Sequence, residues 1–571
     1  MFLTKVTYSM IKGASVNVLD FGATGDGSTD DTLAIQSAID LASATGKTVY
    51  FPAGTYSVVP ATTQEWEGTA LGQGLMTTAF VMKSNMSLYG ELGATIKLAN
   101  NCSTLAAPKL LALFFSNSQL SNLSFQGLTF DMNGLNNRIS PAAPTAFNRF
   151  TQAAIHFSGT IGGIAARGDY VFVDDCKFLN TAGVTCIGMG QSNVSAVTIG
   201  KYWTVTNCLF KNNGLDSDDH SSIYAWADNV VCENNTFTAD TMWPNGFSGN
   251  SGSFVAYEVH GANQRFVNNL VRNHYQGMWV SSNQTSDCDN IVIANNTFSP
   301  IKFVAIDFYR FSAPESVISK VIIDSNTIGL DDTVQSGVVP DLKVAVQINA
   351  SYSLINIQIT NNVCSKIGTN KASAFVNLGI PFGVASQKHT NIVIKNNVAI
   401  GFSLGVYTQT TATNGIGYVE ISGNSFVDFT PQGAFSNPIG VAVDGVSAYD
   451  YLVINNNTFT DSAVTPVFQF GVRLTGTVSN LFVGEQAYNR VINEYVEDTF
   501  TVSGRRQGVS ALTFSALPAQ STWAAGDNAY AYNIAAAGSP EYVIKGWTRI
   551  TTGSGNVLNT DWLENRVLTG N

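Results

Sequence analysis

A five-residue phrase recurs along the central part of this chain. Each copy has a pair of polar residues followed by an apolar alternation, as in ENNTF from Glu233 and ANNTF from Ala294. The copies begin at residues 174, 206, 233, 267, 294, 324, 360, 395, 422 and 455, which are 27 to 36 residues apart. An internal repeat of this length indicates a solenoid, in which each repeat is one structural layer.

The irregular spacing favours coils of three short strands joined by turns of variable length. One coil cannot bury its apolar face alone, so the coils must stack, with parallel strands about 4.8 Å apart. Asparagines at one corner of successive coils can then form a side-chain hydrogen-bond ladder. The repeats are rich in Val, Ile, Thr, Phe and Asn, which disfavours a helical solenoid, and hairpin signals are too sparse for an antiparallel sandwich. The sequence therefore predicts an all-β fold, a parallel β-helix.

Charge and composition exclude several classes of function. Charged residues make up 12% of the 571 residues, about half of the usual share, and the net charge is -11. No basic stripe is present, so neither DNA nor RNA is an expected partner. No apolar run reaches about 18 residues, so no membrane span is expected, and the N-terminus lacks a secretory signal pattern. The seven cysteines lack disulfide or zinc-site spacing, so we expect reduced, buried thiols at Cys176, Cys186, Cys208 and Cys232.

One helix is predicted near the N-terminus. Asp30 or Asp31 can cap it, and Gly46 ends it. Its apolar face is expected to comprise Leu33, Ile35, Ala38, Ile39 and Ala42. We expect this helix to close the N-terminal end of the solenoid, where unpaired strand edges would otherwise invite aggregation.

Four regions are predicted along the chain. Residues 1–15 form a linker, 16–60 the N-terminal cap, 61–499 the β-helix body and 500–571 a small β-domain. The last region combines tryptophans and tyrosines with glycines between them. It is interpreted as a folding or trimerisation cap, with a sugar-binding module as the alternative.

The segment VNVLDFGATGDGSTDDTLAIQSAID from Val16, with VYFPAGTYSV from Val49, resembles the start of the pectate-lyase-like β-helix of bacteriophage tailspikes and capsular polysaccharide depolymerases. The upstream TYSMIKGAS resembles the linker to a virion-anchoring domain. WAAGDNAY from Trp523 and GWTRITTGSG from Gly546 resemble the C-terminal β-domain of some tailspikes. The resemblance implies a right-handed β-helix, a homotrimer and degradation of a bacterial surface polysaccharide. It also implies attachment to the phage tail through an N-terminal anchor or an adaptor, with synthesis in the host cytoplasm and action at the host cell surface.

Candidate catalytic residues emerge when strands of successive coils are aligned. The segments AYEVHG, GMWVSS, AIDFYR and AVQINA, from residues 256, 277, 305 and 345, share one alternation. Their alignment gives an inward column of Val259, Val280, Phe308 and Ile348. It gives two outward columns, one of Glu258, Trp279, Asp307 and Gln347, and the other of His260, Ser281, Tyr309 and Asn349. A slip of one residue would exchange the inward and outward columns.

Glu258 and Asp307 are the predicted catalytic pair. Glycoside hydrolysis uses two carboxyl groups, about 5–5.5 Å apart in retaining enzymes and about 6.5–9.5 Å apart in inverting ones. The two residues are two coils apart, which puts their backbones about 9.6 Å apart, so the inverting range is reachable. Trp279 between them would offer a face to a sugar ring and raise the pKa of a neighbouring carboxyl group. His260 is expected to support the pair by hydrogen bonding.

A second acidic cluster, GLDSDDHSS, contains Asp216, Asp218, Asp219 and His220. Asp218 and Asp219 faintly resemble the paired aspartates of polygalacturonases, although the accompanying motifs are absent. A polar turn, a catalytic pair and a hard-cation site all fit this cluster. The further substrate-binding candidates are Trp243, Trp226, Tyr309, Arg310 and Gln347, with Phe247 beside Trp243 in the segment 238–253.

Three functions fit these residues. The leading hypothesis is an endo-acting glycoside hydrolase of a bacterial surface polysaccharide. A polysaccharide lyase is the second, with His260, Tyr309 and Arg310 serving proton abstraction and charge stabilisation. A glycan-binding spike that cleaves nothing is the third. Neither a metal nor an organic cofactor is expected, because no metal-ligand spacing and no phosphate-binding glycine loop is present.

Overall fold

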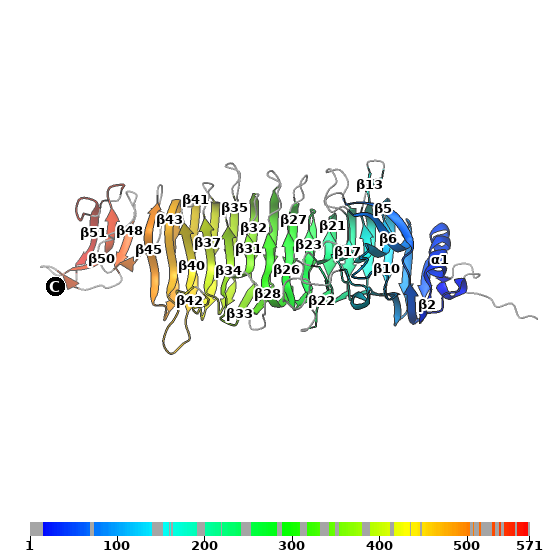
Figure 1. Cartoon of the computed structure of the whole chain (residues 1–571). Helices are drawn as coiled ribbons and strands as arrows, with labels where there is room; N and C mark the ends of the chain where they lie inside the picture. The colour runs from blue at the N-terminus through cyan, green and yellow to red at the C-terminus, as the bar shows by residue number, and fades with distance from the viewer. Residues whose placement is uncertain are drawn as a thin grey trace, which may run out of the picture. The chain divides into compact units, whose positions relative to one another are not determined.

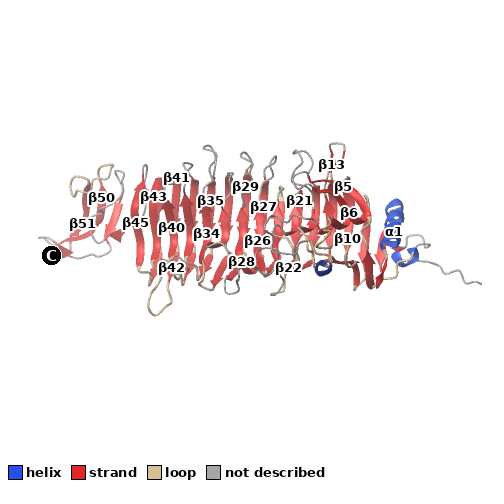
Figure 2. Ribbon diagram, in the orientation of Figure 1, coloured by secondary structure: helices blue, strands red, loops and turns tan. Residues whose placement is uncertain are grey.

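The computed structural model covers most of the chain from residue 15 onward. The described residues are 15–68, 73–139, 152–158, 160–161, 164–190, 200–217, 220–240, 253–281, 288–308, 317–331, 342–348, 353–379, 389–410, 416–433, 435–445, 448–502, 506–507, 513–514, 528–531, 536–537, 542–553, 555 and 557–568. The chain forms two compact units. The first unit is Met1–Asp307 with Val334–Val339, and the second is Phe308–Thr333 with Pro340–Asn571. Strands dominate both units (Figure 1, Figure 2).

Strands of the first unit stack in three parallel series, each strand pairing with its counterpart in the next coil. The first series is β3 (Thr48–Phe51), β7 (Ser87–Gly90), β10 (Gln119–Gln126), β15 (Arg167–Asp174), β18 (Gly200–Thr206), β21 (Ala227–Glu233), β24 (Gln264–Val267) and β27 (Cys288–Ala294). The second is β4 (Gly54–Val58), β8 (Ala94–Leu98), β11 (Thr129–Asp131), β16 (Lys177–Leu179), β19 (Leu209–Lys211), β22 (Thr236–Thr238), β25 (Leu270–Arg272) and β28 (Thr297–Phe308). The third is β6 (Gln73–Val81), β9 (Leu111–Ser116), β12 (Gln152–Phe157), β17 (Thr185–Gly188), β20 (Ser221–Ala225), β23 (Ser253–Val259) and β26 (His274–Val280).

Several shorter elements complete the first unit. They are β1 (Val16–Asn17), η2 (Val18–Phe21), β2 (Asp26–Asp30), α1 (Thr32–Thr45), β5 (Thr62–Gly68), η4 (Gly134–Asn136), β13 (Thr160–Ile161) and β14 (Ile164–Ala165). β1 pairs with β3 and β2 with β4, which extends two of the series toward the N-terminus. β5 pairs with β6 and β13 with β14, both antiparallel.

The core of the first unit is built from aligned apolar side chains. Phe130, Phe178, Phe210 and Phe237 occupy paired positions in the second series and are all buried. Their ring centroids are 5.2, 4.7 and 4.6 Å apart, and the three pairs are stacked. Parallel in-register strands place identical side chains one above another, so the stack follows from the register.

From Glu233 onward, the third residue of each repeated phrase is a buried asparagine, and these asparagines form the predicted ladder. Cys176 and Cys208 take this position in the two earlier copies. Asn235 Nδ2 donates to Asn269 Oδ1 at 3.1 Å, and Asn269 Nδ2 donates to Asn296 Oδ1 at 3.1 Å. The residue before each of these three asparagines has a positive φ of 56 to 58°. Asparagine tolerates this left-handed conformation better than most residues, which explains why the phrase carries a second asparagine. The ladder prediction is confirmed.

The second unit repeats the same arrangement. Its first series is β29 (Ile318–Asp324), β32 (Leu354–Thr360), β35 (Thr390–Lys395), β38 (Ile416–Ser422), β41 (Ala448–Asn455) and β43 (Phe470–Val483). The second series is β30 (Thr327–Asp331), β33 (Val363–Ile367), β36 (Val398–Ile400), β39 (Ser425–Val427), β42 (Thr458–Thr460) and β44 (Ala487–Asn489). The third is β31 (Leu342–Ile348), β34 (Ala372–Gly379), β37 (Leu404–Thr410), β40 (Ile439–Gly445), the start of β43 and β45 (Asn493–Val502).

The ladder of the second unit runs through Asn326, Asn362, Asn397, Asn424 and Asn457. After β46 (Arg506–Gln507), a separate sheet comprises β47 (Thr513–Phe514), β48 (Asn528–Ala531), β49 (Ala536–Ala537), β50 (Tyr542–Arg549) and β51 (Trp562–Leu568). This sheet falls within the region expected to form the C-terminal β-domain. The domain boundaries remain a prediction.

Helix α1 spans Thr32–Thr45 and ends at Gly46, as expected, with Gly46 in the left-handed conformation. The helix contacts β1, β3 and β6 beside the first strands of the unit (Figure 1). The prediction is wrong for Leu33, which is 82% exposed because the buried face runs through Ile35, Ala38, Ile39 and Ala42. Asp30 accepts the backbone hydrogen bond of Thr32, whereas the carboxylate of Asp31 accepts bonds from Thr24 and Gly25.

The structure confirms the predicted fold class, because parallel strands in three series form a β-helix. The seven cysteines are free, and Cys176, Cys186, Cys208 and Cys232 are buried as expected. Asp26 accepts bonds from the backbone of Ser28 and Thr29, so its carboxylate closes a turn. Across the described ranges, no helix is both long and apolar enough to cross a membrane.

Candidate functional site

The third series of strands in the first unit carries the predicted catalytic column. Glu258 on β23 pairs with Trp279 on β26, and Val259 pairs with Val280, as the sequence alignment predicted. Tyr224 on β20 occupies the same position one strand earlier. Strand β26 also pairs with β28, which ends with Asp307 and Phe308. Trp279 therefore lies on the strand between those of the two carboxylates.

The Glu258 carboxylate is held at both oxygens. Its Oε1 lies 2.9 Å from His260 Nε2, and its Oε2 accepts a hydrogen bond of 2.5 Å from Ser221 Oγ. The side chain is 12% exposed, so the carboxylate reaches solvent while its rotamer is fixed. The arrangement fits a carboxylate that must be held in one orientation, because hydrogen bonds to both oxygens restrict its rotation.

His260 is buried against two aromatic rings. Its ring centroid lies 4.6 Å from that of Trp226 and 5.0 Å from that of Tyr224. Trp226 is 5% exposed, so its ring supports the histidine rather than presenting a face to solvent. A contact of Trp226 with substrate stays a prediction. The expectation that His260 supports the pair by hydrogen bonding agrees with its contact to Glu258.

Asp307 is buried, whereas the sequence predicted an exposed position on the outer face of its strand. It is 7% exposed, and its Oδ2 accepts a hydrogen bond of 3.0 Å from Gln276 Nε2. Burial raises the pKa of Asp307 to about 7, because the charged carboxylate loses water, while the bond from Gln276 lowers it in part. A carboxyl group with this pKa is half protonated near neutral pH, which suits a general acid.

Trp279 is half-buried beside an apolar cluster of Phe254, Val255 and Tyr275. Its ring meets Phe254 edge to face, with centroids 5.5 Å apart and an angle of 89° between the ring planes. Phe303 packs against the same cluster and tilts toward Tyr275. The cluster fixes the indole ring, and an indole held in this way can present its remaining surface to a sugar ring.

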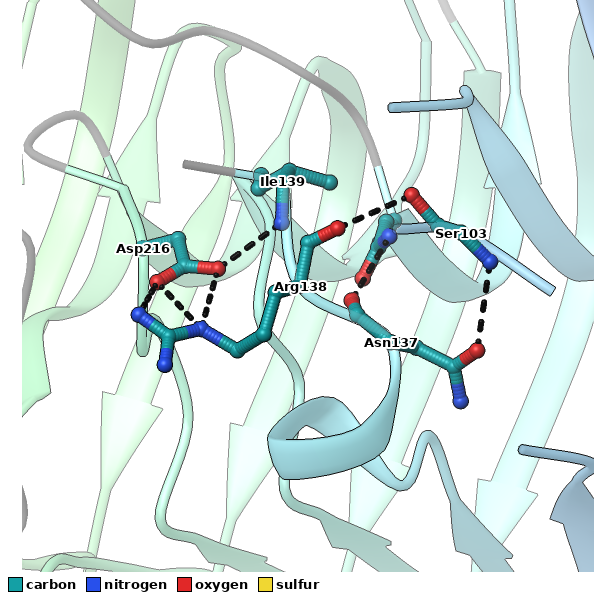
Figure 3. Close-up of polar contacts among 6 residues, drawn as sticks. Ser103, Asn137, Arg138, Ile139 and Asp216 are labelled. Atoms are coloured by element: carbon teal, nitrogen blue, oxygen red, sulfur yellow. Dashed lines mark hydrogen bonds and ion pairs between the residues drawn. The ribbon is translucent and has the colours of Figure 1, made fainter. Parts of the chain in front are cut away.

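Asp216, the first aspartate of the second acidic cluster, has a structural role. Arg138 Nε lies 2.8 Å from both oxygens of Asp216, and the backbone N–H of Ile139 donates to Oδ2 at 2.8 Å (Figure 3). Asp216 is buried, and the neighbouring Asn137 accepts a bond from Ser103 N (Figure 3). Asp216 therefore holds the segment after η4 in place. Its carboxylate is committed to Arg138, so the hard-cation interpretation does not apply to this residue.

The other predicted site residues lie outside the strands of Glu258 and Asp307 or outside the described residues. His220 is buried, with Nδ1 2.7 Å from Gly183 O, and burial lowers its pKa to about 3. Gln347 belongs to the second unit, where it pairs with Asn377 on the neighbouring strand. The candidates outside the described residues are Asp218, Asp219, Trp243, Phe247, Tyr309, Arg310 and Asn349. Among the side chains that the structure describes, no three His, Cys, Asp or Glu residues converge as a metal site.

Sequence reasoning missed Ser221 and Gln276, which also bond the two carboxylates. Both occupy one register position, since Ser221 pairs with Val255 and Val255 pairs with Gln276. This position lies three residues before the column of Glu258 and Trp279. A polar residue in a strand that is otherwise buried was the available signal, and the alternation of inward and outward residues did not explain it.

Residues 15–241 match a protein family described as rhamnogalacturonase A/epimerase, pectate lyase-like. Mannuronan C5-epimerase AlgE3 of Azotobacter vinelandii is 38% identical over 120 residues, which are 20% of this chain and 6% of that protein. Alginate lyase 7 of the same organism is 45% identical over 82 residues, which are 14% of this chain and 8% of that protein. The chain thus spans a small part of these curated relatives.

Solved structures similar to this chain include the tailspike protein of E. coli bacteriophage HK620 in complex with pentasaccharide. Its TM-score is 0.60 at 15% identity, and the match covers 97% of this chain and 92% of the tailspike chain. A double mutant of the same tailspike gives a TM-score of 0.59 at 16% identity, covering 83% and 78%. At these identities the likeness establishes the fold, which is the tailspike parallel β-helix.

Proposed function

We propose that this protein binds a bacterial surface polysaccharide and cleaves it by endo-glycosidic hydrolysis, as a phage tailspike depolymerase. The tailspike fold and the pectate lyase-like match of residues 15–241 support a polysaccharide ligand. The observation that carries the proposal is the placement of Glu258 and Asp307 on two strands that both pair with β26, the strand of Trp279. Two carboxyl groups with different environments are what glycoside hydrolysis requires.

Asp307 is the proposed general acid. Its raised pKa of about 7 keeps a proton available near neutral pH, and this proton goes to the glycosidic oxygen as the bond to the leaving sugar breaks. Glu258 is the proposed general base, which takes a proton from the attacking water. Two strand spacings put the two backbones about 9.6 Å apart, which leaves room for water and favours inversion at the anomeric carbon.

The neighbouring side chains have positioning roles in this proposal. Ser221 and His260 hold the Glu258 carboxylate, and Gln276 holds that of Asp307. Trp279 lies on β26, the strand between those of Glu258 and Asp307, and would support the sugar ring whose bond is cleaved. None of these steps needs a metal ion, so we expect cleavage to continue in EDTA.

A lyase is the second candidate, favoured by the match to alginate lyase 7. In that reaction His260, Tyr309 and Arg310 would serve proton abstraction and charge stabilisation. The products separate the two reactions, because hydrolysis adds one water to each cleaved bond whereas elimination leaves an unsaturated uronate that absorbs near about 235 nm.

The experiment is digestion of a panel of purified capsular polysaccharides, followed by mass spectrometry of the fragments. Fragments that carry one added water, formed in H2(18)O with one labelled oxygen, support hydrolysis. Unsaturated fragments reject hydrolysis in favour of the lyase. Polymers that bind but stay intact reject both enzymes in favour of a spike that only binds glycan.

We propose a homotrimer attached to the phage tail through an N-terminal anchor or an adaptor protein, acting at the host cell surface. Stacked coils leave few unpaired edges, so the trimer should resist heat and detergent. A monomer in light scattering at micromolar concentration contradicts this assembly.

A further inference from the structure

A column of residues with left-handed backbone runs along the first series of strands in the first unit. The residues on either side of the column pair from one strand to the next, so the register aligns its members. They have φ between 55 and 60° and are Asn85, Asn122, Tyr170, Tyr202, Asn229, Asn263 and Asn290. Asparagine suits this conformation and also forms bonds along the column, since Asn122 Nδ2 donates to Asn85 Oδ1 at 3.0 Å and Asn290 Nδ2 donates to Asn263 Oδ1 at 2.8 Å.

Tyr170 on β15 and Tyr202 on β18 depart from the pattern of this column. A short polar side chain tolerates a positive φ, whereas a bulky side chain in this region is an outlier that costs conformational energy. The fold itself does not need tyrosine here, because the other members of the column are asparagines with the same backbone conformation. Residues that break a local rule in this way are concentrated at functional sites.

The rings of Tyr170 and Tyr202 form an exposed aromatic pair. Their centroids are 4.9 Å apart and the ring planes differ by 13°, so the rings are stacked. Tyr170 is nevertheless 59% exposed and Tyr202 48% exposed. The next members of the column on either side, Asn122 and Asn229, have shorter side chains, so they leave the outer parts of the two rings uncovered.

The surface around the tyrosine pair is polar. Lys201 is exposed, and the half-buried Asp169 forms an ion pair of 3.2 Å with Arg167. Among the described residues of β10, β15, β18 and β21, Phe172 is the only other large hydrophobic side chain that is exposed. A stable protein interface buries about 1,200–2,000 Å² around an apolar core, which this small patch does not offer. A pyranose ring has an apolar C–H face and a polar edge, so it matches a ring-sized aromatic surface with a polar border.

We infer that the pair of Tyr170 and Tyr202 is a saccharide-binding platform, on which an uncharged pyranose ring of the polysaccharide packs through its C–H face. The inference rests on the proposed polysaccharide ligand, but not on cleavage. The platform belongs to the first series of strands, whereas Glu258 lies on the third. Lys201 and Asp169 carry opposite charges, so the border of the platform does not select an acidic or a basic sugar. A second contact with the same polymer raises its effective concentration at the proposed catalytic pair.

The test uses the purified capsular polysaccharides of the digestion panel as probes. They are bound to the full chain in its native assembly, with Glu258→Gln present to prevent cleavage during the measurement. Hydroxyl-radical footprinting with mass spectrometry should find Tyr170 and Tyr202 reactive in the free protein and protected by the polymer that binds. Tyr170→Asn combined with Tyr202→Asn should weaken binding about 5- to 10-fold, the size of an aromatic contact. This fold-change should be equal at low and high salt, because the contact is uncharged.

Three comparisons separate binding from folding. The double asparagine variant restores the usual residue of the column, so it should unfold at the wild-type temperature or above it. Tyr170→Phe combined with Tyr202→Phe keeps both rings and should keep most of the affinity. Tyr451→Asn is the matched control, since Tyr451 on β41 is 53% exposed and its φ is not positive, and this variant should bind as the wild type does.

The outcomes distinguish this inference from the proposed hydrolysis. A polymer that binds through the tyrosine pair but stays intact with the wild type rejects the hydrolysis and supports the platform. A polymer that the wild type cleaves, and that the double asparagine variant binds with full affinity, overturns the platform alone. The platform is also overturned if the asparagine variant loses stability but not affinity, or if no polymer of the panel binds. Tyrosines that are already protected in the free assembly would assign this surface to a contact between copies and overturn the inference.

Discussion

Gln276 Nε2 donates a hydrogen bond to Asp307 Oδ2 across 3.0 Å, which joins the neighbouring strands β26 and β28. The bond and the burial of Asp307 have opposite effects on the pKa of its carboxyl group. Burial raises the pKa of Asp307 to about 7, and the bond from the amide stabilises the charged form and lowers the pKa. The proton affinity of the proposed general acid therefore depends on a residue that takes no part in the chemistry.

The first prediction concerns the alkaline side of the pH–rate profile. Cleavage should decline above about pH 7, because Asp307 then loses the proton that it donates. Gln276→Leu removes the bond to the charged form, so the decline should move to higher pH. The measurement is kcat/KM against pH for both proteins, with Gln264→Leu as the comparison, since Gln264 bonds Tyr257 and lies on β24. An alkaline limb that does not move in Gln276→Leu contradicts the role of Asp307.

The second prediction concerns stability against pH. A free aspartate has a pKa of about 3.9, whereas that of Asp307 is about 7 in the folded chain. Between these values the folded state binds more protons than the unfolded state, so the free energy of unfolding falls as pH rises. The contribution of Asp307 is complete below about pH 4 and is lost as pH passes about 7. Asp307→Asn should flatten this slope in thermal melts from pH 4 to 8, and an unchanged slope would refute the burial argument.

The third prediction concerns the catalytic pair. Glu258→Gln and Asp307→Asn should each reduce the cleavage rate at least about 100-fold, since each removes a general acid or base. Both amides keep the shape of the side chain, so polysaccharide binding should persist. Glu233→Gln serves as the matched control, because Glu233 is a half-buried strand residue of β21 whose Oε1 bonds Asn268. Folded variants of Glu258 and Asp307 with full activity would place the site elsewhere.

The sequence alone was sufficient to predict the fold class and part of the candidate site. The repeated phrase predicted stacked coils because asparagines such as Asn235, Asn269 and Asn296 recur where successive coils turn the same corner. The pairing of Glu258 with Trp279 followed from strict alternation in two short segments. These features are local in the sequence, so they can be read without knowing how the coils pack.

The burial of Asp307 could not be predicted from alternation. Alternation separates the two faces of a strand, but it says nothing of what covers the outer face. Here Phe303 on the strand of Asp307 packs with the Phe254 and Tyr275 cluster, and Gln276 reaches the carboxylate from the neighbouring strand. The length and packing of these side chains decide the exposure, and neither has a periodic signal.

The fourth prediction tests the buried ladder. Asn362 Nδ2 donates to Ile323 O and to Asn397 Oδ1, and its own Oδ1 accepts from Asn326. Asn362→Ala should lower the free energy of unfolding by about 1–3 kcal/mol, because buried partners are left without bonds. Asn391→Gly is the control, since Asn391 is exposed, has a positive φ of 54° and loses a surface bond to Asn356. Equal unfolding midpoints for both variants would show that the ladder adds little.

The last prediction separates structural from catalytic aspartates. Asp216 is buried and accepts bonds from Arg138 and from the backbone of Ile139, so its charge is compensated inside the fold (Figure 3). Breaking a buried ion pair costs about 3–5 kcal/mol, and the lower end applies because the Arg138 side chain is 35% exposed. Asp216→Asn and Arg138→Met should each lower the unfolding midpoint, and the double variant should lose less than the sum of the two. In contrast to Glu258→Gln, the kcat of the folded fraction should stay at the wild-type value. A stable Asp216→Asn protein that has lost cleavage would instead assign this aspartate to the active site.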